Sequence, residues 1–267
     1  MKTKIILLVV FMFLGVSKSQ AQFFKKLKDR VEQTVENVVV EKTADKAAET
    51  TSKSMDKVFD MNPFGGGDGK ADANQVANSY DFTWKYSLKM TTKQGDMVFD
   101  YYLKPDASYF GFTTATMKDM FTVMDNGNNV TVMFMNSKGN NIGMASQMPD
   151  DLDLEEMADE SAKFKFEVLP NKSINGYDCK GVKATSDEYI MTMYFTNEAE
   201  ISFDDIYKNQ QTNIPVELKK YFDPNDKMLM ISMDMKSLKN EKYDAKMECI
   251  GLEEVQKTIK KSDYKIM

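Results

Sequence analysis

The side chains of this sequence that could bind a metal or react are mainly thioethers and thiols, because it has 22 Met and two Cys but no His. Met191 and Met193, like Met233 and Met235, are separated by one residue. In a strand this spacing puts both sulfur atoms on one face, about 7 Å apart. Three interpretations stay open: an ordinary core, a flexible lining for an apolar ligand such as an acyl chain, or a thioether site for Cu(I), a soft metal.

The absence of histidine removes several kinds of active site. Histidine-based triads, imidazole acids or bases and histidine metal sites all need a residue that the chain lacks. The chain also has no phosphate-binding glycine loop and no nucleophile elbow. The acidic residues 150–156 lack the ligand spacing of a calcium loop and fit a solvated helix start. We expect a protein that is not an enzyme and has no resident cofactor or metal.

The first 21 residues have the pattern of a secretory signal peptide. Lys2 and Lys4 precede an apolar run over residues 5–15, and Ser19 and Ala21 supply the small residues of a cleavage site. The run is too short to span a bilayer, which takes about 20 residues. We therefore predict export and cleavage near Ala21, with the mature chain in the periplasm or secreted and without a transmembrane segment. The net charge of −6 argues against a nucleic-acid partner.

Export would place Cys179 and Cys249, the two cysteines of the chain, in an oxidising compartment. Two cysteines in an oxidising compartment favour one disulfide. It would close a loop of about 70 residues and contribute about 4 kcal/mol in the chain-entropy model. The alternative is two buried free thiols. A catalytic cysteine is not expected, since no histidine is present to activate it.

The mature chain divides into three parts by composition. Residues 22–60 contain no Gly or Pro, carry apolar residues at helical spacing and predict a long charged helix that is solvated or docks a partner. Residues 61–75 contain Pro and several Gly and predict a linker. Residues 76–267 form the predicted β domain.

Within this domain the apolar residues recur with a period of two. Phe82, Trp84 and Tyr86 alternate with Thr83 and Lys85, and the same period returns over residues 97–103, 164–168, 189–195 and 229–235. Alternation indicates strands with one buried face, and short turns between them indicate antiparallel neighbours. About ten such strands must curl or close. The fold class is therefore mainly β with α: a curled antiparallel sheet or incomplete barrel, with short helices at 152–160 and 213–221.

One stretch carries a family resemblance. Lys172-Ser173-Ile174-Asn175-Gly176-Tyr177-Asp178-Cys179-Lys180 resembles the K-x-I-x-G-Y-x-C-K signature of an uncharacterised family of exported proteins whose members look like lipoprotein carriers of the LolA/LolB-like fold. The resemblance implies an incomplete barrel with helices plugging its open side, over residues 76–267. It does not imply shuttle activity, because such carriers latch their lid with an arginine and Arg30, the single arginine, lies outside the domain. It assigns no catalytic residue, and it implies a structural role for the signature turn.

Together these observations predict a periplasmic protein that binds a lipid or acylated peptide in an apolar, Met-lined half-barrel. The predicted cavity lining is Phe82, Trp84, Tyr86, Met97, Phe99, Met191, Met193, Leu229, Ile231 and Met233. This choice assumes that the apolar faces of all strands point into one interior. The alternative is an envelope protein with a filled barrel, which docks a protein partner through residues 22–60; Cu(I) binding is the third hypothesis.

Overall fold

The computed structural model describes residues 71–267 apart from 94, 116–118, 138–139, 149–163 and 204–226. The predicted signal peptide, N-terminal helix, most of the linker and both predicted short helices lie outside these described residues. The helical elements of the described part are three 3₁₀ turns, η1 (Ala73–Gln75), η2 (Glu241–Tyr243) and η3 (Lys261–Asp263).

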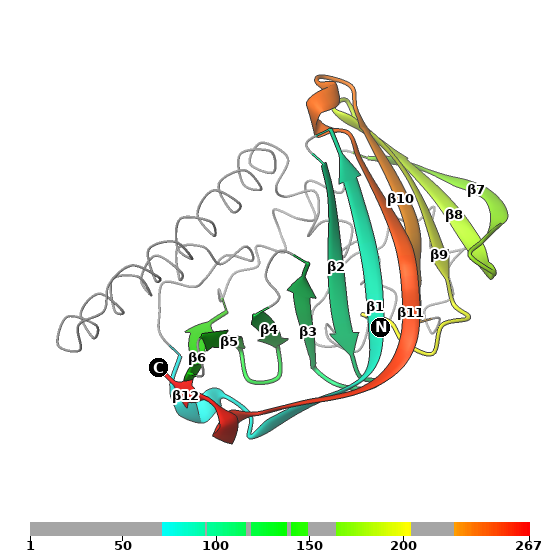
Figure 1. The fold of residues 1–267 in the computed structure, drawn as a ribbon. Helices are drawn as coiled ribbons and strands as arrows, with labels where there is room; N and C mark the ends of the chain where they lie inside the picture. Colours follow the sequence, from blue (N-terminus) through cyan, green and yellow to red (C-terminus); the bar gives the residue numbers. More distant parts are fainter. Residues whose placement is uncertain (1–70, 94, 116–118, 138–139, 149–163, 204–226) are drawn as a thin grey trace.

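Strands make up most of the described chain and confirm the predicted curled, mainly β sheet (Figure 1). The twelve strands form one sheet in the order β12-β6-β5-β4-β3-β2-β1-β11-β10-β9-β8-β7. They are β1 (Ser79–Thr92), β2 (Gly95–Leu103), β3 (Tyr109–Thr114), β4 (Met120–Asp125), β5 (Val130–Ser137), β6 (Asn140–Gln147), β7 (Lys165–Ile174), β8 (Tyr177–Thr185), β9 (Tyr189–Thr196), β10 (Leu229–Ser237), β11 (Ala245–Lys260) and β12 (Lys265–Ile266).

Short turns join most successive strands, as the sequence predicted. The hairpin between β7 and β8 turns at Asn175 and Gly176, which have φ angles of 54° and 87°. Two residues at positive φ match the twist of flanking strands, and Asn-Gly is the pair that adopts this conformation most readily. All strand pairs are antiparallel except β12 and β6, which are parallel. The predicted curled antiparallel sheet is confirmed, with this short parallel pair added at its edge.

The parallel pair arises from the path of β11. This strand pairs with β1 from Ala245 to Lys260, and the chain then continues through η3 into β12 at the far edge of the sheet. Its last third therefore crosses strands β2–β6, as Figure 1 shows where β11 sweeps along the bottom toward β12. Two register shifts bend the β1–β11 pair, between Phe82 and Trp84 and between Ser87 and Leu88. At both, β11 has one residue more than β1, and such bulges increase twist and bend a strand.

The bend separates a main core from a second core, and Met133 and Met144 form a third, smaller cluster. The main core gathers side chains of β1–β4 and β8–β11, among them Tyr86, Met193 and Met233. The second core lies where the β1 and β11 ends pass β4–β6. Its members are Ala71, Val76, Tyr80, Phe82, Phe121, Val123, Val130, Val132, Phe134, Ala145 and Ile259. The assumption of one interior is therefore wrong, and the bulge beyond Phe82 is the physical reason.

A buried carboxylate organises the second core. Asp125, 1% exposed, ends β4 and is the one buried charged side chain among the described residues. Its Oδ2 accepts hydrogen bonds from Tyr80 Oη at 3.1 Å and from the side-chain Nδ2 of Asn128 at 2.6 Å. Its Oδ1 accepts one from the backbone N–H of Asn128. Tyr80 Oη in turn accepts from the Ala77 amide. These bonds tie the β4–β5 turn to the start of β1 and satisfy a group that would be costly to bury alone.

Removing the hydroxyl that donates to Asp125 should weaken the fold. We expect Tyr80→Phe to lower the free energy of unfolding by about 1–3 kcal/mol, because the carboxylate and the Ala77 amide each lose a partner. Urea unfolding followed by circular dichroism measures the change. The control is Tyr264→Phe, which removes the hydroxyl of a half-buried tyrosine in the same core and should change stability less. Equal effects of the two substitutions would contradict the role given to Asp125.

Candidate ligand-binding site

Most of the predicted lining residues lie in the main core. Buried members are Tyr86, Met191, Met193, Leu229, Ile231 and Met233, and half-buried Trp84 and Phe99 pack against them. Two of the ten are placed differently. Phe82 belongs to the second core, and Met97 is half-buried at the end of β2, opposite Met90. The structure therefore places eight of the ten in the main core, Met97 beside it on the same face, and Phe82 in the second core.

Strand register aligns five methionines across five neighbouring strands. Met193 on β9 faces Met233 on β10, which faces Met247 on β11; Met247 faces Met90 on β1, which faces Met97 on β2. We call these five residues the methionine row. Cross-strand partners share one face of a sheet, so the row spans about 19 Å at the spacing of adjacent strands. Sequence reasoning missed Met90 and Met247 as lining residues, because only the register shows that they join the row.

An aromatic cluster lies beside the methionine row on the same face. Tyr101 on β2 faces Tyr86 on β1 and Phe112 on β3. Phe203 stands edge-on to the Tyr101 ring, with centroids 5.4 Å apart and planes at 88°. Phe110 lies 6.2 Å from the same ring. The methionines of the row are buried except for the half-buried Met97. Unbranched thioethers next to rigid rings can adapt their shape to a flexible chain.

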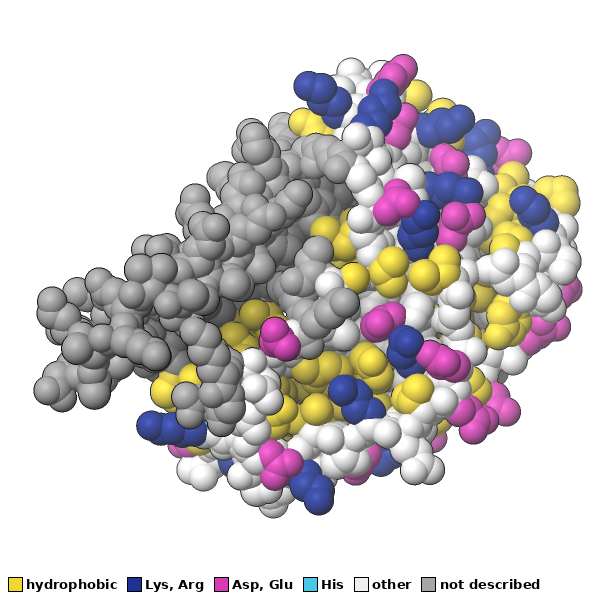
Figure 2. Space-filling model, viewed as in Figure 1, with side chains coloured by type: hydrophobic (Ala, Val, Ile, Leu, Met, Phe, Trp, Pro, Cys, Tyr) yellow, Lys and Arg dark blue, Asp and Glu magenta, His cyan; other side chains and the backbone are white. Residues whose placement is uncertain are grey.

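The opposite face of the central strands carries charge. Lys85 and Lys89 alternate with the buried residues of β1, and Lys85 pairs with Glu253 at 2.8 Å while Lys89 pairs with Asp96 at 2.6 Å. These pairs are partly or largely exposed, so they contribute little to stability. Figure 2 shows hydrophobic side chains gathered in the middle and lower parts of the viewed face, with charged side chains densest toward the top and right. At these central strands one face of the sheet is thus apolar and the other is charged.

Two tyrosines of the main core, Tyr86 and Tyr101, are held in their neutral form. Burial is the largest cause that raises the pKa of Tyr86 well above that of an exposed tyrosine, and burial alone raises the pKa of Tyr101. The Tyr86 hydroxyl donates a hydrogen bond to the Met230 carbonyl. Neither tyrosine is prepared to act as a base or nucleophile, because both ionise less readily than an ordinary tyrosine.

The signature stretch of the sequence forms the β7–β8 hairpin and is fastened to β11. Asn175 at its turn donates a hydrogen bond from Nδ2 to the Cys249 carbonyl at 2.7 Å. This carbonyl lies beside Ile250, the extra residue of β11 at the register shift between Ser87 and Leu88. A bulge leaves backbone groups outside the regular ladder. The side-chain amide satisfies one of them and ties the hairpin to the centre of the sheet.

The predicted disulfide is absent from the structure, where Cys179 and Cys249 are both free and buried. Each thiol faces a carbonyl two residues away on its own strand: Cys179 Sγ lies 3.5 Å from the Tyr177 oxygen, and Cys249 Sγ lies 3.6 Å from the Gly251 oxygen. Burial raises the pKa of both thiols, so neither is activated as a nucleophile. The hairpin is attached to the strand bearing Cys249 through Asn175 instead of through a disulfide.

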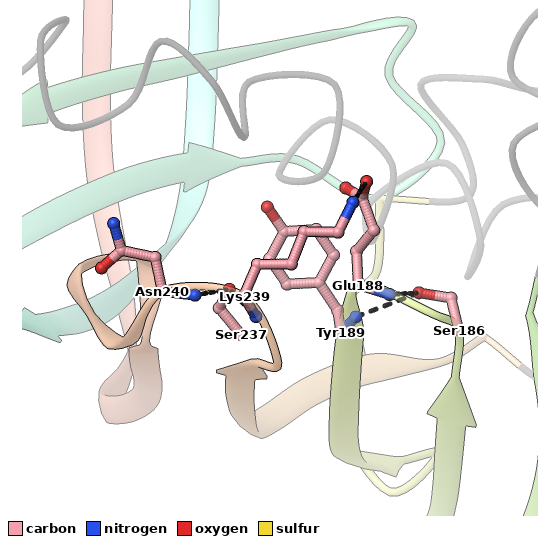
Figure 3. A network of polar contacts seen from close by, with 6 residues as sticks. All are labelled: Ser186, Glu188, Tyr189, Ser237, Lys239 and Asn240. Atoms are coloured by element: carbon pink, nitrogen blue, oxygen red, sulfur yellow. Dashed lines mark hydrogen bonds and ion pairs between the residues drawn. The ribbon is translucent and has the colours of Figure 1, made fainter.

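A polar network at the ends of β9 and β10 has a structural role (Figure 3). Ser186 Oγ accepts from the amides of Glu188 and Tyr189 at 3.2 and 3.1 Å, and Ser237 Oγ accepts from the Asn240 amide at 3.1 Å. An exposed ion pair joins Lys239 to Glu188. The hydroxyls satisfy turn backbone, as Ser commonly does in loops, and we assign the network no chemistry.

Metal and membrane features can be tested only over the described residues. Among them, no three His, Cys, Asp or Glu side chains are grouped as metal ligands would be. A separate search of the same residues finds no helix with the length and hydropathy needed to cross a membrane. Binding of Cu(I) by thioethers is tested by neither result and stays a prediction.

Comparisons with known proteins identify a family and several distant structures. A family model described as a domain of unknown function, DUF4412, matches residues 82–256. No curated protein matches the chain. An uncharacterised conserved protein from Thermus thermophilus is 8% identical, with 68% of this chain and 82% of that one covered and a TM-score of 0.36. A LolA superfamily protein from Nitrosomonas europaea is 7% identical, with 68% and 89% covered and a TM-score of 0.25.

A third similar structure belongs to a much longer protein. PNGF-II is 9% identical and covers 69% of this chain with a TM-score of 0.35, but the match spans only 30% of PNGF-II itself. The curled sheet described above is established by the strand order and register of this chain. These distant similarities give no information on what the protein does.

The buried tyrosines predict how the protein responds to alkali. The pKa values of Tyr80, Tyr86 and Tyr101 are raised in the folded state, so that state holds these protons more tightly than the unfolded chain. Their contribution to stability is complete below about pH 10, the ordinary tyrosine pKa, and is lost as the pH rises further. A phenolate absorbance titration should show these groups ionising only together with loss of the circular dichroism signal. Ionisation of all 12 tyrosines before unfolding would contradict the burial described here.

The hairpin attachment can be tested at Asn175. Asn175→Asp keeps the size and the tolerance of positive φ but replaces the donor by an oxygen facing the Cys249 carbonyl. We expect a loss of about 1–2 kcal/mol in unfolding free energy. Protonation of the new carboxyl should restore part of the difference from the unsubstituted protein below about pH 4. Asn175→Gly, which removes the whole side chain and still tolerates the positive φ, is the control and should show no such recovery. Unchanged stability of both variants would rule out the attachment.

Proposed function

The chain belongs to the DUF4412 family of domains of unknown function, and we propose that it binds a lipid or acylated peptide without catalysing a reaction on it. The acyl chain lies along the methionine row, with the aromatic cluster at its side. The observation that carries this proposal is the alignment of five thioethers on one apolar face of a curled sheet.

The energetic basis is burial of the ligand's apolar surface. Each methylene moved from water to such a face contributes about 0.8 kcal/mol. Among the described residues, the one buried charged side chain is Asp125, which lies outside the main core, so a hydrocarbon chain meets no desolvated charge there. Methionine adapts to irregular shapes better than branched residues do, and this favours ligands of variable acyl length over one rigid molecule.

The same features support a binding role over a catalytic one. The two thiols and the tyrosines Tyr86 and Tyr101 of the main core have raised pKa values, and no histidine is present. A group poised for general acid or base work would have a pKa near the working pH. We further propose that the protein acts in the periplasm, or outside the cell, after export directed by residues 1–21.

The proposal is tested by charge placed on the apolar face. We expect Met193→Glu and Met97→Glu each to lower the amount of lipid that copurifies with the protein at least about tenfold, because a carboxylate beside an acyl chain is costly to desolvate. Native mass spectrometry of protein isolated gently from its own cell envelope measures the bound lipid, with a denatured sample as reference. Met97 is half-buried, so its variant should fold even where Met193→Glu does not.

The matched control is Ile190→Glu. Ile190 lies on the same strand as Met193, on the opposite face and opposite Lys236, so the same charge is added away from the methionine row. Lipid binding should survive this substitution. Equal binding by all variants would exclude the methionine row as the site.

The interaction-protein hypothesis leads to a different result. Residues 22–60 lie outside the described residues, and their role stays a prediction. Deleting them should spare copurifying lipid if the apolar face is the binding site. Loss of a copurifying envelope protein, with no lipid bound to either form, would favour the partner-docking alternative.

A further inference from the structure

The buried Tyr101 of the main core has a hydroxyl group without a hydrogen-bond partner among the described residues. Tyr101 is 6% exposed and lies among buried apolar side chains. Within the described part of the chain its hydroxyl makes no hydrogen bond, whereas the hydroxyls of Tyr80, Tyr86 and Tyr109 each donate one. A buried hydroxyl without a partner is costly and uncommon. Such a group points to a missing acceptor.

The surroundings of Tyr101 restrict what that acceptor can be. Its ring is enclosed by Phe99, Phe110 and Phe203, with centroids 6.3, 6.2 and 5.4 Å away. No Lys or Arg is buried within the described residues, so a carboxylate or phosphate in the main core would lack a counter-charge. A single water is also poorly suited, because buried water needs two to four polar partners. The acceptor that fits is neutral and attached to an apolar molecule.

The position of Tyr101 relates it to the methionine row. Tyr101, Phe99 and Met97 alternate along β2 on one face, so the hydroxyl-bearing ring lies about 13 Å along the strand from the end of the row. A ligand with its polar atom at Tyr101 can extend its hydrocarbon part past Phe99 toward Met97 and Met90.

We propose that the Tyr101 hydroxyl anchors the ligand by donating a hydrogen bond to a carbonyl oxygen, so that the ligand is an acyl ester or acyl amide. This inference rests on the proposed function, because it assigns the ligand class of the same apolar face. Apolar burial supplies most of the affinity, and the hydroxyl selects carbonyl-bearing chains over plain hydrocarbon.

The test compares two probes on the full mature chain. Methyl laurate carries an ester carbonyl and n-tetradecane, of nearly equal length, carries none. Affinities come from displacement of the neutral apolar dye N-phenyl-1-naphthylamine. We expect Tyr101→Phe to weaken methyl laurate about 5- to 10-fold, the range for one hydrogen bond, and to leave n-tetradecane unchanged. Equal effects on both probes, or no effect on either, would overturn the inference.

A stability measurement separates an anchor from a structural hydroxyl. Without ligand, Tyr101→Phe should leave the unfolding midpoint unchanged or raise it, because it removes an unpaired polar group. Tyr86→Phe should lower the midpoint, because it removes the bond to Met230. A lower midpoint for Tyr101→Phe would assign its hydroxyl to the fold and overturn the inference. Failure of the unsubstituted protein to bind either probe would instead contradict the proposed function itself.

Discussion

The long β1–β11 ladder is the constraint on which the rest of the structure depends. β11 must pair with β1 in the middle of the sheet and still deliver β12 to the edge at β6. A regular ladder cannot do both, and the extra residues of β11 opposite β1 provide the bend. The same bend creates the second core and frees the Cys249 carbonyl that the β7–β8 hairpin captures through Asn175. Curvature, core division and hairpin attachment therefore share one cause.

The two cores differ in how they treat polar groups. In the second core a buried carboxylate is fully engaged by Tyr80 and Asn128, which fixes the geometry where the chain crosses itself. The main core has no such centre within the described residues. It is rich in methionine and aromatic side chains, and the Tyr101 hydroxyl has no partner in that part of the chain. A satisfied polar network specifies a rigid structure, whereas an adaptable apolar face with one unused donor suits a ligand.

Because both thiols are free, no covalent bridge contributes to the stability of the described part of the chain. A disulfide would have constrained the unfolded chain, whereas the structure attaches the signature hairpin through the Asn175 amide. This hydrogen bond holds the hairpin to β11 in the folded state and does not constrain the unfolded chain. It also leaves the hairpin free to separate from β11 without any change in redox state. The Asn-Gly pair thus serves both the turn and its attachment.

The sequence by itself determined the strands, because a period of two depends only on which side chains face water, and it determined the β7–β8 turn, because Asn175 and Gly176 tolerate positive φ. It also identified most of the apolar face, including Met193 and Met233. Only the tertiary structure decided which faces meet. The bulges of β11 exist only relative to β1, so the placement of Phe82 in the second core could not be read from alternation. Likewise, the alignment of Met90 and Met247 and the missing partner of Tyr101 depend on strand register, which no local pattern in one sequence fixes.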